Sequence, residues 1–268
     1  MSSFIRNAAT KKRKTGITVL DKFINTLEPG TIILIKEDEY SFIHNYLLNI
    51  FLSEGVCENE SRILAVSKNG PVEIYQVDNE KVCDEQLSKM YIAWRYNNLR
   101  PDKSDCKFLL TDKLDYRHDL MAKNDITVDN IIERLNSCSN YRVALFSLFS
   151  PSYKVNNIYQ ALYNIRKAVR LHGHVCMISI PTFFYDKVIF DQYFDIVMSL
   201  DSNFFTNLLP NYKAIIHFEK ITFLNKIREN NTDTYKFGIK FYKNKLVIEK
   251  IDIPPVDIEQ PSIDCRSF

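Results

Sequence analysis

Apolar residues along this chain fall into short continuous runs, and most runs are followed by a stretch with helical spacing. The runs predict buried strands at 31–35, 63–66, 143–148, 175–180 and 196–200. A strand that is apolar at every position is covered on both faces, which is typical of parallel sheets with flanking helices. The pattern therefore predicts an α/β fold built on a mainly parallel sheet flanked by helices.

The intervening helices are predicted from apolar residues that recur every three or four positions. This spacing is found in 42–53, 126–135 and 155–171, and it recurs at Leu87, Met90, Tyr91 and Trp94. Gly173 follows the third of these stretches, and glycine commonly ends a helix at that place.

The last part of the chain has a different pattern. Apolar positions cluster at 214–218, 237–241 and 246–251 with no helical stretch between them, and the last two segments flank Lys243-Asn244. We expect these two segments to form a hairpin. The sheet is therefore predicted to end in antiparallel strands at its C-terminal edge.

The chain of 268 residues has the length of one large domain or two small ones, and its pattern favours a single domain over 14–253. Residues 1–13 are predicted to form a basic tail and 254–268 an acidic tail that contains prolines. The run Lys11–Lys14 could contact the phosphates of a nucleic acid, direct the protein to the nucleus, or only keep the tail solvated. The net charge of +2 excludes a uniformly basic nucleic-acid coat but leaves room for a local patch.

The six cysteines are scattered, and none forms a C-x-x-C pair. This spacing argues against zinc ribbons and redox dithiols, and it is compatible with a reducing compartment. The basic N-terminal residues are not followed by an apolar stretch, and no run approaches the ~18 apolar residues of a membrane span. We therefore expect a soluble intracellular protein.

The junction between the first strand and its helix is the first place to look for chemistry, because ligands of open α/β sheets bind beyond the carboxyl ends of the strands. A phosphate loop would need glycines, a lysine and a Ser or Thr at the helix start. This junction instead carries Glu37, Asp38 and Glu39, followed by Ser41. One carboxylate at ~5 Å opposes a phosphate charge by roughly 3 kcal/mol at an effective dielectric of ~20, whereas a helix N-terminus contributes at most ~2 kcal/mol.

Three interpretations of this acidic junction stay open. One carboxylate could cap the helix, the carboxylates could bind Mg²⁺ or Ca²⁺, or the loop could hydrolyse nucleotide in an unusual way. At the end of strand 143–148, Ser147 and Ser150 occupy the place where a nucleotide hydrolase carries an Mg²⁺-binding Asp. We conclude that the chain is built like a nucleotide-binding domain without the catalytic equipment.

Other catalytic signals are weak. His172 and His174 have a spacing that occurs in metal sites, but a histidine in the last turn of a helix more often interacts with the helix dipole. No glycine elbow surrounds a serine, and no Cys–His arrangement stands out, so nothing in the sequence favours nucleophilic catalysis.

Several segments resemble a known family. Residues 15–23 and 28–31, which lead into the first strand, resemble the entry to RecA-like ATPase domains. The glycine-free loop 37–39, the string Met90-Tyr-Ile-Ala-Trp-Arg-Tyr96, and 207–214 followed by His217 are similar to the Elongator subunit 4 family. The resemblance covers roughly 14–255, which is nearly the whole predicted domain.

The resemblance implies a RecA-like fold without a Walker A motif. It implies a non-catalytic subunit that forms a hetero-hexameric ring with Elongator subunits 5 and 6, joins the catalytic part of the complex, binds tRNA and supports modification of the wobble uridine (U34). Catalysis would reside in the radical-SAM acetyltransferase subunit. The expected compartments are cytoplasm and nucleus, with no membrane or DNA partner. No cofactor or metal is expected in this subunit itself, although ATP at a shared interface stays open.

The candidate site residues are chosen from where the predicted RecA-like fold would place them. Lys213, Lys220, Lys226 and Arg228 are candidates for tRNA phosphate, and Phe204, Phe205 and Tyr212 for base stacking. The alternative is that these aromatic residues pack beneath their own loop. Trp94, Arg95 and Tyr96 are candidates for a subunit interface, with helix core as the alternative. The alternative to the scaffold function is an active RecA-like ATPase whose phosphate loop is the unusual segment Glu37, Asp38, Glu39 and Ser41.

Overall fold

The computed structural model describes residues 13–24, 27–60, 62–68, 72–77, 108–114, 120–121, 127–185, 188–202, 212–222, 236–242 and 245–251. Its strands are β1 (Ile32–Lys36), β2 (Ile63–Val66), β3 (Ile74–Val77), β4 (Phe108–Leu114), β5 (Leu120–Met121), β6 (Arg142–Leu145), β7 (Val175–Ile180), β8 (Ile196–Asp201), β9 (Ala214–Ile221), β10 (Lys236–Tyr242) and β11 (Lys245–Lys250). Its α-helices are α1 (Thr18–Ile24), α2 (Ile43–Cys57), α4 (Val128–Asn136) and α5 (Ile158–His172).

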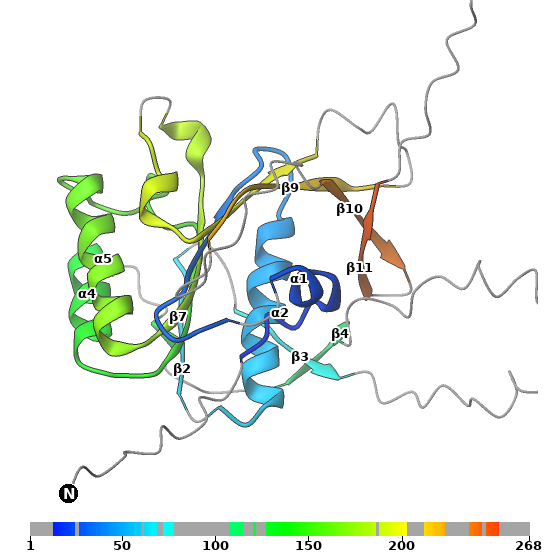
Figure 1. The fold of residues 1–268 in the computed structure, drawn as a ribbon, viewed down its shortest axis with the longest axis horizontal. Helices are drawn as coiled ribbons and strands as arrows, with labels where there is room; N and C mark the ends of the chain where they lie inside the picture. The colour runs from blue at the N-terminus through cyan, green and yellow to red at the C-terminus, as the bar shows by residue number, and fades with distance from the viewer. Residues whose placement is uncertain are drawn as a thin grey trace, which may run out of the picture.

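A nine-stranded sheet in the order β11-β10-β9-β8-β1-β7-β6-β2-β5 forms the centre of the molecule (Figure 1). The strands from β8 to β5 pair in parallel, with β1 between β7 and β8. β9, β10 and β11 continue the sheet with antiparallel pairing. The predicted parallel core, the hairpin and the antiparallel C-terminal edge are therefore confirmed.

Helices cover both faces of the parallel strands, with α4 and α5 on one side and α1 and α2 on the other (Figure 1). The alternation along β1 shows why both faces are apolar. Ile32 and Leu34 belong to the apolar cluster under α4 and α5. Ile33 and Ile35 belong to the cluster under α1 and α2. Because successive strand residues face opposite sides, an all-apolar strand fits only between two helical layers.

Local signals set the ends of the outer helices. Thr127 caps α4 by accepting a hydrogen bond from the amide of Asn130 in a capping box. Asn157 caps α5 in the same way, through the amide of Gln160. Gly173 ends α5 in the left-handed conformation, with φ of 64°. The ending predicted from Gly173 is thus confirmed.

Some elements were not predicted. α1, the two-residue β5 and the separate two-stranded sheet β3–β4 are too short to give a clear period, although they contain apolar residues. The predicted helix around 87–94 and the C-terminal tail lie outside the described residues. Arg13, predicted to end the basic tail, instead forms a bridge with Leu27 and belongs to the folded domain.

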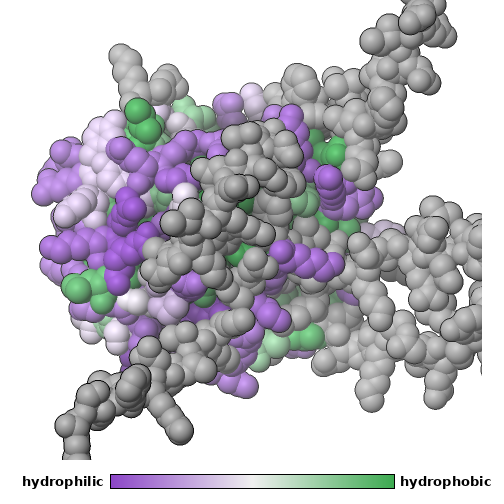
Figure 2. Space-filling view, in the orientation of Figure 1, coloured by the Kyte–Doolittle hydropathy of each residue, from purple (hydrophilic) through white to green (hydrophobic). Residues whose placement is uncertain are grey.

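The described part of the chain contains no helix long and apolar enough to cross a membrane. The surface over α4 and α5, at the left of both views, is mostly hydrophilic (Figure 2). This is the outer side of an amphipathic helical layer, whose apolar side packs on the sheet.

Candidate functional site

The carboxyl ends of β1, β6 and β7 open into a hollow of ≈ 510 Å³, which we call the strand-end cleft. Its walls come from the loops after these strands, from the first turns of α2 and from the 3-10 turn η2 (Thr182–Phe184). The residues that matter below are Glu37, Phe42, His44, Ser147, Phe183 and Phe184. The cleft lies where open α/β sheets bind their ligands.

Glu37 follows β1 and points into the protein. Its amide donates to the carbonyl of Ile180 at 2.9 Å, which extends the β1–β7 pairing by one residue. Its side chain is only 6% exposed. Burial raises the pKa of the Glu37 carboxyl, and the hydroxyls of Ser179 and Ser147 act against this rise. Oε1 has no hydrogen-bond partner among the described residues.

His44 faces Glu37 from the first turn of α2. Its Nε2 lies 3.7 Å from Glu37 Oε2, and its side chain is 5% exposed. Burial lowers the pKa of His44 to about 4, although Asp38 acts in the opposite direction. The imidazole is therefore neutral at pH 7, and this contact is not an ion pair. His44 Nδ1 has no partner within the described structure.

The prediction that Glu37, Asp38 or Glu39 caps α2 is wrong. The N-cap residue is Phe42, and no side chain in the described chain caps this helix end. Asp38 instead accepts from the amide of Tyr40 at 3.1 Å and from the hydroxyl of Ser202. Asp38 thus fastens the loop to the end of β8 and does not cap α2.

The serines at the end of β6, Ser147 and Ser150, line the same cleft as Glu37. The amide of Ser147 donates to Ser179 Oγ at 2.8 Å. Ser150 Oγ and Ser152 Oγ share a hydrogen bond of 2.8 Å. Ser147 has a positive φ of 46°, which turns the chain sharply away from β6.

A shallower hollow of ≈ 530 Å³ adjoins the strand-end cleft and shares Glu37 and Phe183 with it. We call it the acidic hollow, because Asp38, Glu39, Asp201 and Glu219 line it. The nearby cation Lys36 is already engaged, by Asp191 at 2.9 Å and by Glu219. The hydrogen bonds and ion pairs from these two carboxylates hold the pKa of Lys36 above its ordinary value against the effect of burial.

These residues do not fit a triphosphate. The loop from Lys36 to Phe42 has no glycine, and no Lys or Arg lines the strand-end cleft in the described part of the chain. Ser41, at the position where a phosphate loop would present a hydroxyl, has a buried Oγ without a partner in the same part. An anion here would meet carboxylates and aromatic rings, and the amide and hydroxyl groups of the described lining come without a cation to balance its charge.

Among the described tRNA candidates, Lys213 and Lys220 are not brought together. Lys213 is exposed before β9, whereas Lys220 lies near the other end of that strand. Lys220 Nζ donates to the carbonyls of Asp191 and Phe194, both at 2.8 Å. Tyr212 bonds to Glu249 through its hydroxyl and packs against Gly238. The structure thus gives Lys220 and Tyr212 structural contacts.

The remaining predicted residues lie outside the described part of the chain. They are Phe204, Phe205, Lys226 and Arg228 of the tRNA set and Trp94, Arg95 and Tyr96 of the interface set. Their roles stay predictions. Of the described candidates, Lys213 is left as an exposed cation on the side of the sheet where β8 ends.

The two histidines near the end of α5 do not form a metal site. His174 Nδ1 accepts from the amide of Tyr141 at 3.0 Å, and Nε2 lies 2.9 Å from the carbonyl of Leu135. Both ring nitrogens are therefore used in structural contacts. No group of three or more His, Cys, Asp or Glu side chains among the described residues is arranged to hold a metal ion.

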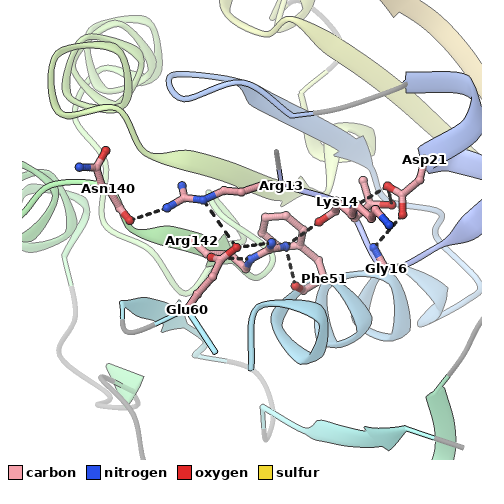
Figure 3. A network of polar contacts seen from close by, with 9 residues as sticks. Arg13, Lys14, Gly16, Asp21, Phe51, Glu60, Asn140 and Arg142 are labelled. Carbon is pink, nitrogen blue, oxygen red and sulfur yellow. Dashed lines mark hydrogen bonds and ion pairs between the residues drawn. The ribbon is translucent and has the colours of Figure 1, made fainter. Parts of the chain in front are cut away.

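Sequence reasoning missed a polar network at the opposite edge of the sheet, where the parallel strands begin (Figure 3). Arg142, the first residue of β6, is completely buried. It donates to Glu60 through Nε at 3.0 Å and Nη2 at 2.7 Å, and through Nη1 to the carbonyls of Lys14 and Phe51. An arginine that opens an otherwise apolar strand was the signal for this network.

Comparison with known proteins gives the family. The model of the family described as PAXNEB protein matches residues 9–126 and 122–267. The chain belongs to the PAXNEB protein family. This PAXNEB chain is 23% identical to Elongator complex protein 4 of Xenopus laevis over 325 aligned residues, covering 90% of this chain and 79% of that protein. It is also 23% identical to the Homo sapiens Elongator complex protein 4, over 90% of this chain and 76% of that protein.

The resemblance to the Elongator subunit 4 family is thereby confirmed. A KaiC-like protein of Pyrococcus horikoshii also aligns with the PAXNEB chain, with a TM-score of 0.49 and 14% identity, over 89% of this chain and 98% of that chain. The strand order itself, a parallel core extended by the antiparallel strands β9–β11, is the arrangement that the sequence predicted.

Proposed function

We propose that this PAXNEB chain is a non-catalytic subunit of the Elongator complex. In this proposal it assembles with subunits 5 and 6 into a hetero-hexameric RecA-like ring that binds tRNA and supports modification of the wobble uridine. The similarity to Elongator complex protein 4 along 90% of the chain supports the place in the complex.

The strand-end cleft is the observation that carries the non-catalytic part of the proposal. A nucleotide hydrolase needs donors and a cation around the phosphates. Here the described walls contain amide and hydroxyl groups but no Lys or Arg, and Lys36 is held by Asp191 and Glu219. The sheet architecture of a nucleotide-binding domain is kept, whereas the edge where such domains bind their ligand is acidic and apolar. A domain of this kind is suited to assembly.

Co-expression of the full chain with subunits 5 and 6 tests the assembly. We expect a single complex whose native mass corresponds to two copies of each subunit. A chain that stays alone under these conditions would contradict the proposal. ATP turnover by the isolated chain with Mg²⁺, lost in Glu37→Gln, would instead favour the active ATPase.

tRNA binding is tested on the assembled ring with Lys213→Glu. Charge reversal at a phosphate contact should weaken binding roughly tenfold and lower the salt slope by about one. Lys167→Glu is the matched control, because Lys167 is exposed on α5, in the helical layer that covers the other face of the sheet. Equal effects of the two substitutions would exclude a specific contribution of Lys213.

A further inference from the structure

The strand-end cleft contains two buried polar atoms that have no partner among the described residues. They are Glu37 Oε1 and His44 Nδ1. Both side chains are more than nine-tenths buried and line the same cleft. Buried polar atoms in native proteins are nearly always hydrogen-bonded, so two unpartnered atoms in one cleft indicate a missing ligand.

The charge of the cleft selects a cation. Its charged lining consists of Glu37 and Glu73, and none of its described walls carries Lys or Arg. His44 adds no positive charge, because its pKa of about 4 leaves it neutral at pH 7. The acidic hollow next to it adds Asp38 and Glu39. A positively charged group is therefore attracted to this edge of the sheet, and an anion is repelled.

The aromatic rings around the cleft select the kind of cation. Phe42, Phe183 and Phe184 line the cleft and are 75%, 40% and 55% exposed. The ring centroids of Phe183 and Phe184 are 4.5 Å apart. A guanidinium is planar, stacks on aromatic faces and presents several donors in one plane, whereas an ammonium is a strongly hydrated point charge. The combination of rings and acceptors favours arginine over lysine.

The acceptors have the chemistry that a guanidinium needs. A carboxylate oxygen accepts hydrogen bonds from N–H groups, and a neutral imidazole offers one ring nitrogen as an acceptor. In the tautomer that turns Nε2–H toward Glu37, that acceptor is Nδ1 of His44. Both atoms are closed to solvent in this structure, so the two side chains turn toward the cleft when Glu37 Oε1 and His44 Nδ1 receive N–H groups from one planar cation.

We propose that the strand-end cleft receives an arginine side chain of a neighbouring protein subunit, which donates to Glu37 and His44 and stacks on Phe183 and Phe184. The identity of the occupant as a subunit rests on the function proposed above. Exposed phenyl rings around a buried acceptor are typical of the pocket that an interface arginine fills. The cleft would then anchor assembly at the edge where related folds bind a ligand.

The chemistry is tested on the isolated full chain with the tripeptide Gly-Arg-Gly, capped at both ends. Binding is followed by NMR and compared with the capped citrulline analogue, which has nearly the same shape without the charge. We expect the arginine peptide to bind at least ~10-fold more tightly than the citrulline peptide, and Glu37→Gln to remove most of this difference. No binding of the arginine peptide, or equal binding of both peptides, would overturn the proposal.

The assembly is tested with subunits 5 and 6 and the same variant. Glu37→Gln should raise the dissociation constant of the complex at least ~10-fold, whereas Glu133→Gln, a change at an exposed carboxylate of α4, should leave it unchanged. Unchanged assembly of Glu37→Gln would overturn the cleft proposal and leave the function intact. Failure of the wild-type chain and of Glu133→Gln to assemble would instead contradict the function, while the peptide experiment would still decide the chemistry of the cleft.

Discussion

Charged side chains are buried at both edges of the parallel sheet, but Arg142 at one edge and Glu37 with His44 at the other are paired to different degrees. At the edge where the strands begin, the guanidinium of Arg142 meets the carboxylate of Glu60 and two backbone carbonyls (Figure 3). At the edge where they end, Glu37 and His44 each keep an atom without a partner in the described structure. A buried charge whose donors are matched holds a fold together, whereas a buried acceptor left unmatched is available to a ligand.

The largest effect is expected from Arg142→Ala. This change leaves the buried Glu60 carboxylate without its main partner and frees the carbonyls of Lys14 and Phe51. Breaking a buried ion pair from one side costs about 3–5 kcal/mol. We expect a loss of this size in the free energy of unfolding, measured with urea.

Arg62→Ala is the matched control, because Arg62 is exposed and donates to Ser139 at the same edge of the sheet. Its loss should cost less than about 1 kcal/mol. If Arg142→Ala and Arg62→Ala lower the free energy of unfolding equally, the hydrogen bonds of the buried Arg142 add no particular stability, and the contrast with Glu37 and His44 would fail.

The next effect is a loss of stability in acid that originates at His44. Its pKa is about 4 in the folded protein and 6.5 in its ordinary environment. The unfolded chain therefore binds a proton first, and stability is lost as the pH falls from about 6.5 to 4, in total about 3 kcal/mol. The groups facing His44 are Glu37 at 3.7 Å and the charge of Asp38.

Urea unfolding of the wild type and His44→Gln at pH 7 and pH 4 measures this contribution. The variant should lose less stability on acidification, and the difference between the two proteins should be about 3 kcal/mol. Equal losses in both proteins would mean that His44 titrates normally, and the carboxyl edge would then not be as buried as described.

Gly55→Ala sharpens the comparison at the matched edge. An added Cβ would lie 2.6 Å from Arg142 Cδ and 2.7 Å from Nε, and the hydrogen bonds of the guanidinium prevent this side chain from moving aside. Alanine in a helix is otherwise favoured by about 1 kcal/mol over glycine. We expect destabilisation by about 1–2 kcal/mol, because overpacking outweighs propensity. A stabilised variant would show that the Arg142 network is loose.

The smallest effect is expected from Glu37→Gln in the isolated chain. The pKa of Glu37 is raised in the folded protein. Its contribution to stability is therefore complete below its ordinary pKa and is lost as the pH rises through the folded pKa. At pH 7 the variant should be as stable as the wild type or more stable by less than about 1 kcal/mol, by urea unfolding. A destabilisation above this size would show that the Glu37 carboxylate is already stabilised within the chain, by the hydroxyls of Ser179 and Ser147, and does not wait for a ligand.

The fold was largely predictable, because the strongest signals lie in the sheet. All-apolar segments such as Ile32–Ile35 fit only between two helical layers, and Gly173 marks a helix end through its backbone conformation. β5 was missed because two residues have no period. β3 and β4 were missed because the sheet that they form lies apart from the main one and alternates only weakly.

The site was predictable only in part. The acidic loop was found, since it follows the first strand. Glu37, however, was predicted as a possible cap of α2, and this helix begins only after Phe42. Phe183 and Phe184 come from a turn that no periodic pattern marks. Lys213 and Lys220 are close in the sequence and were grouped as one set of candidates. They lie at opposite ends of β9, because a strand advances about 3.4 Å per residue.

The place of β1 in the sheet has a consequence for how the protein is made. β1 is the first strand to leave the ribosome, yet its neighbours are β7 and β8, and the amide of Ile32 donates to Asp195, 163 positions further along. Until those strands are synthesised, the apolar residues of β1 have no ladder to join. A chaperone that shields β1 during translation would therefore meet its strongest demand before the second half of the sheet appears.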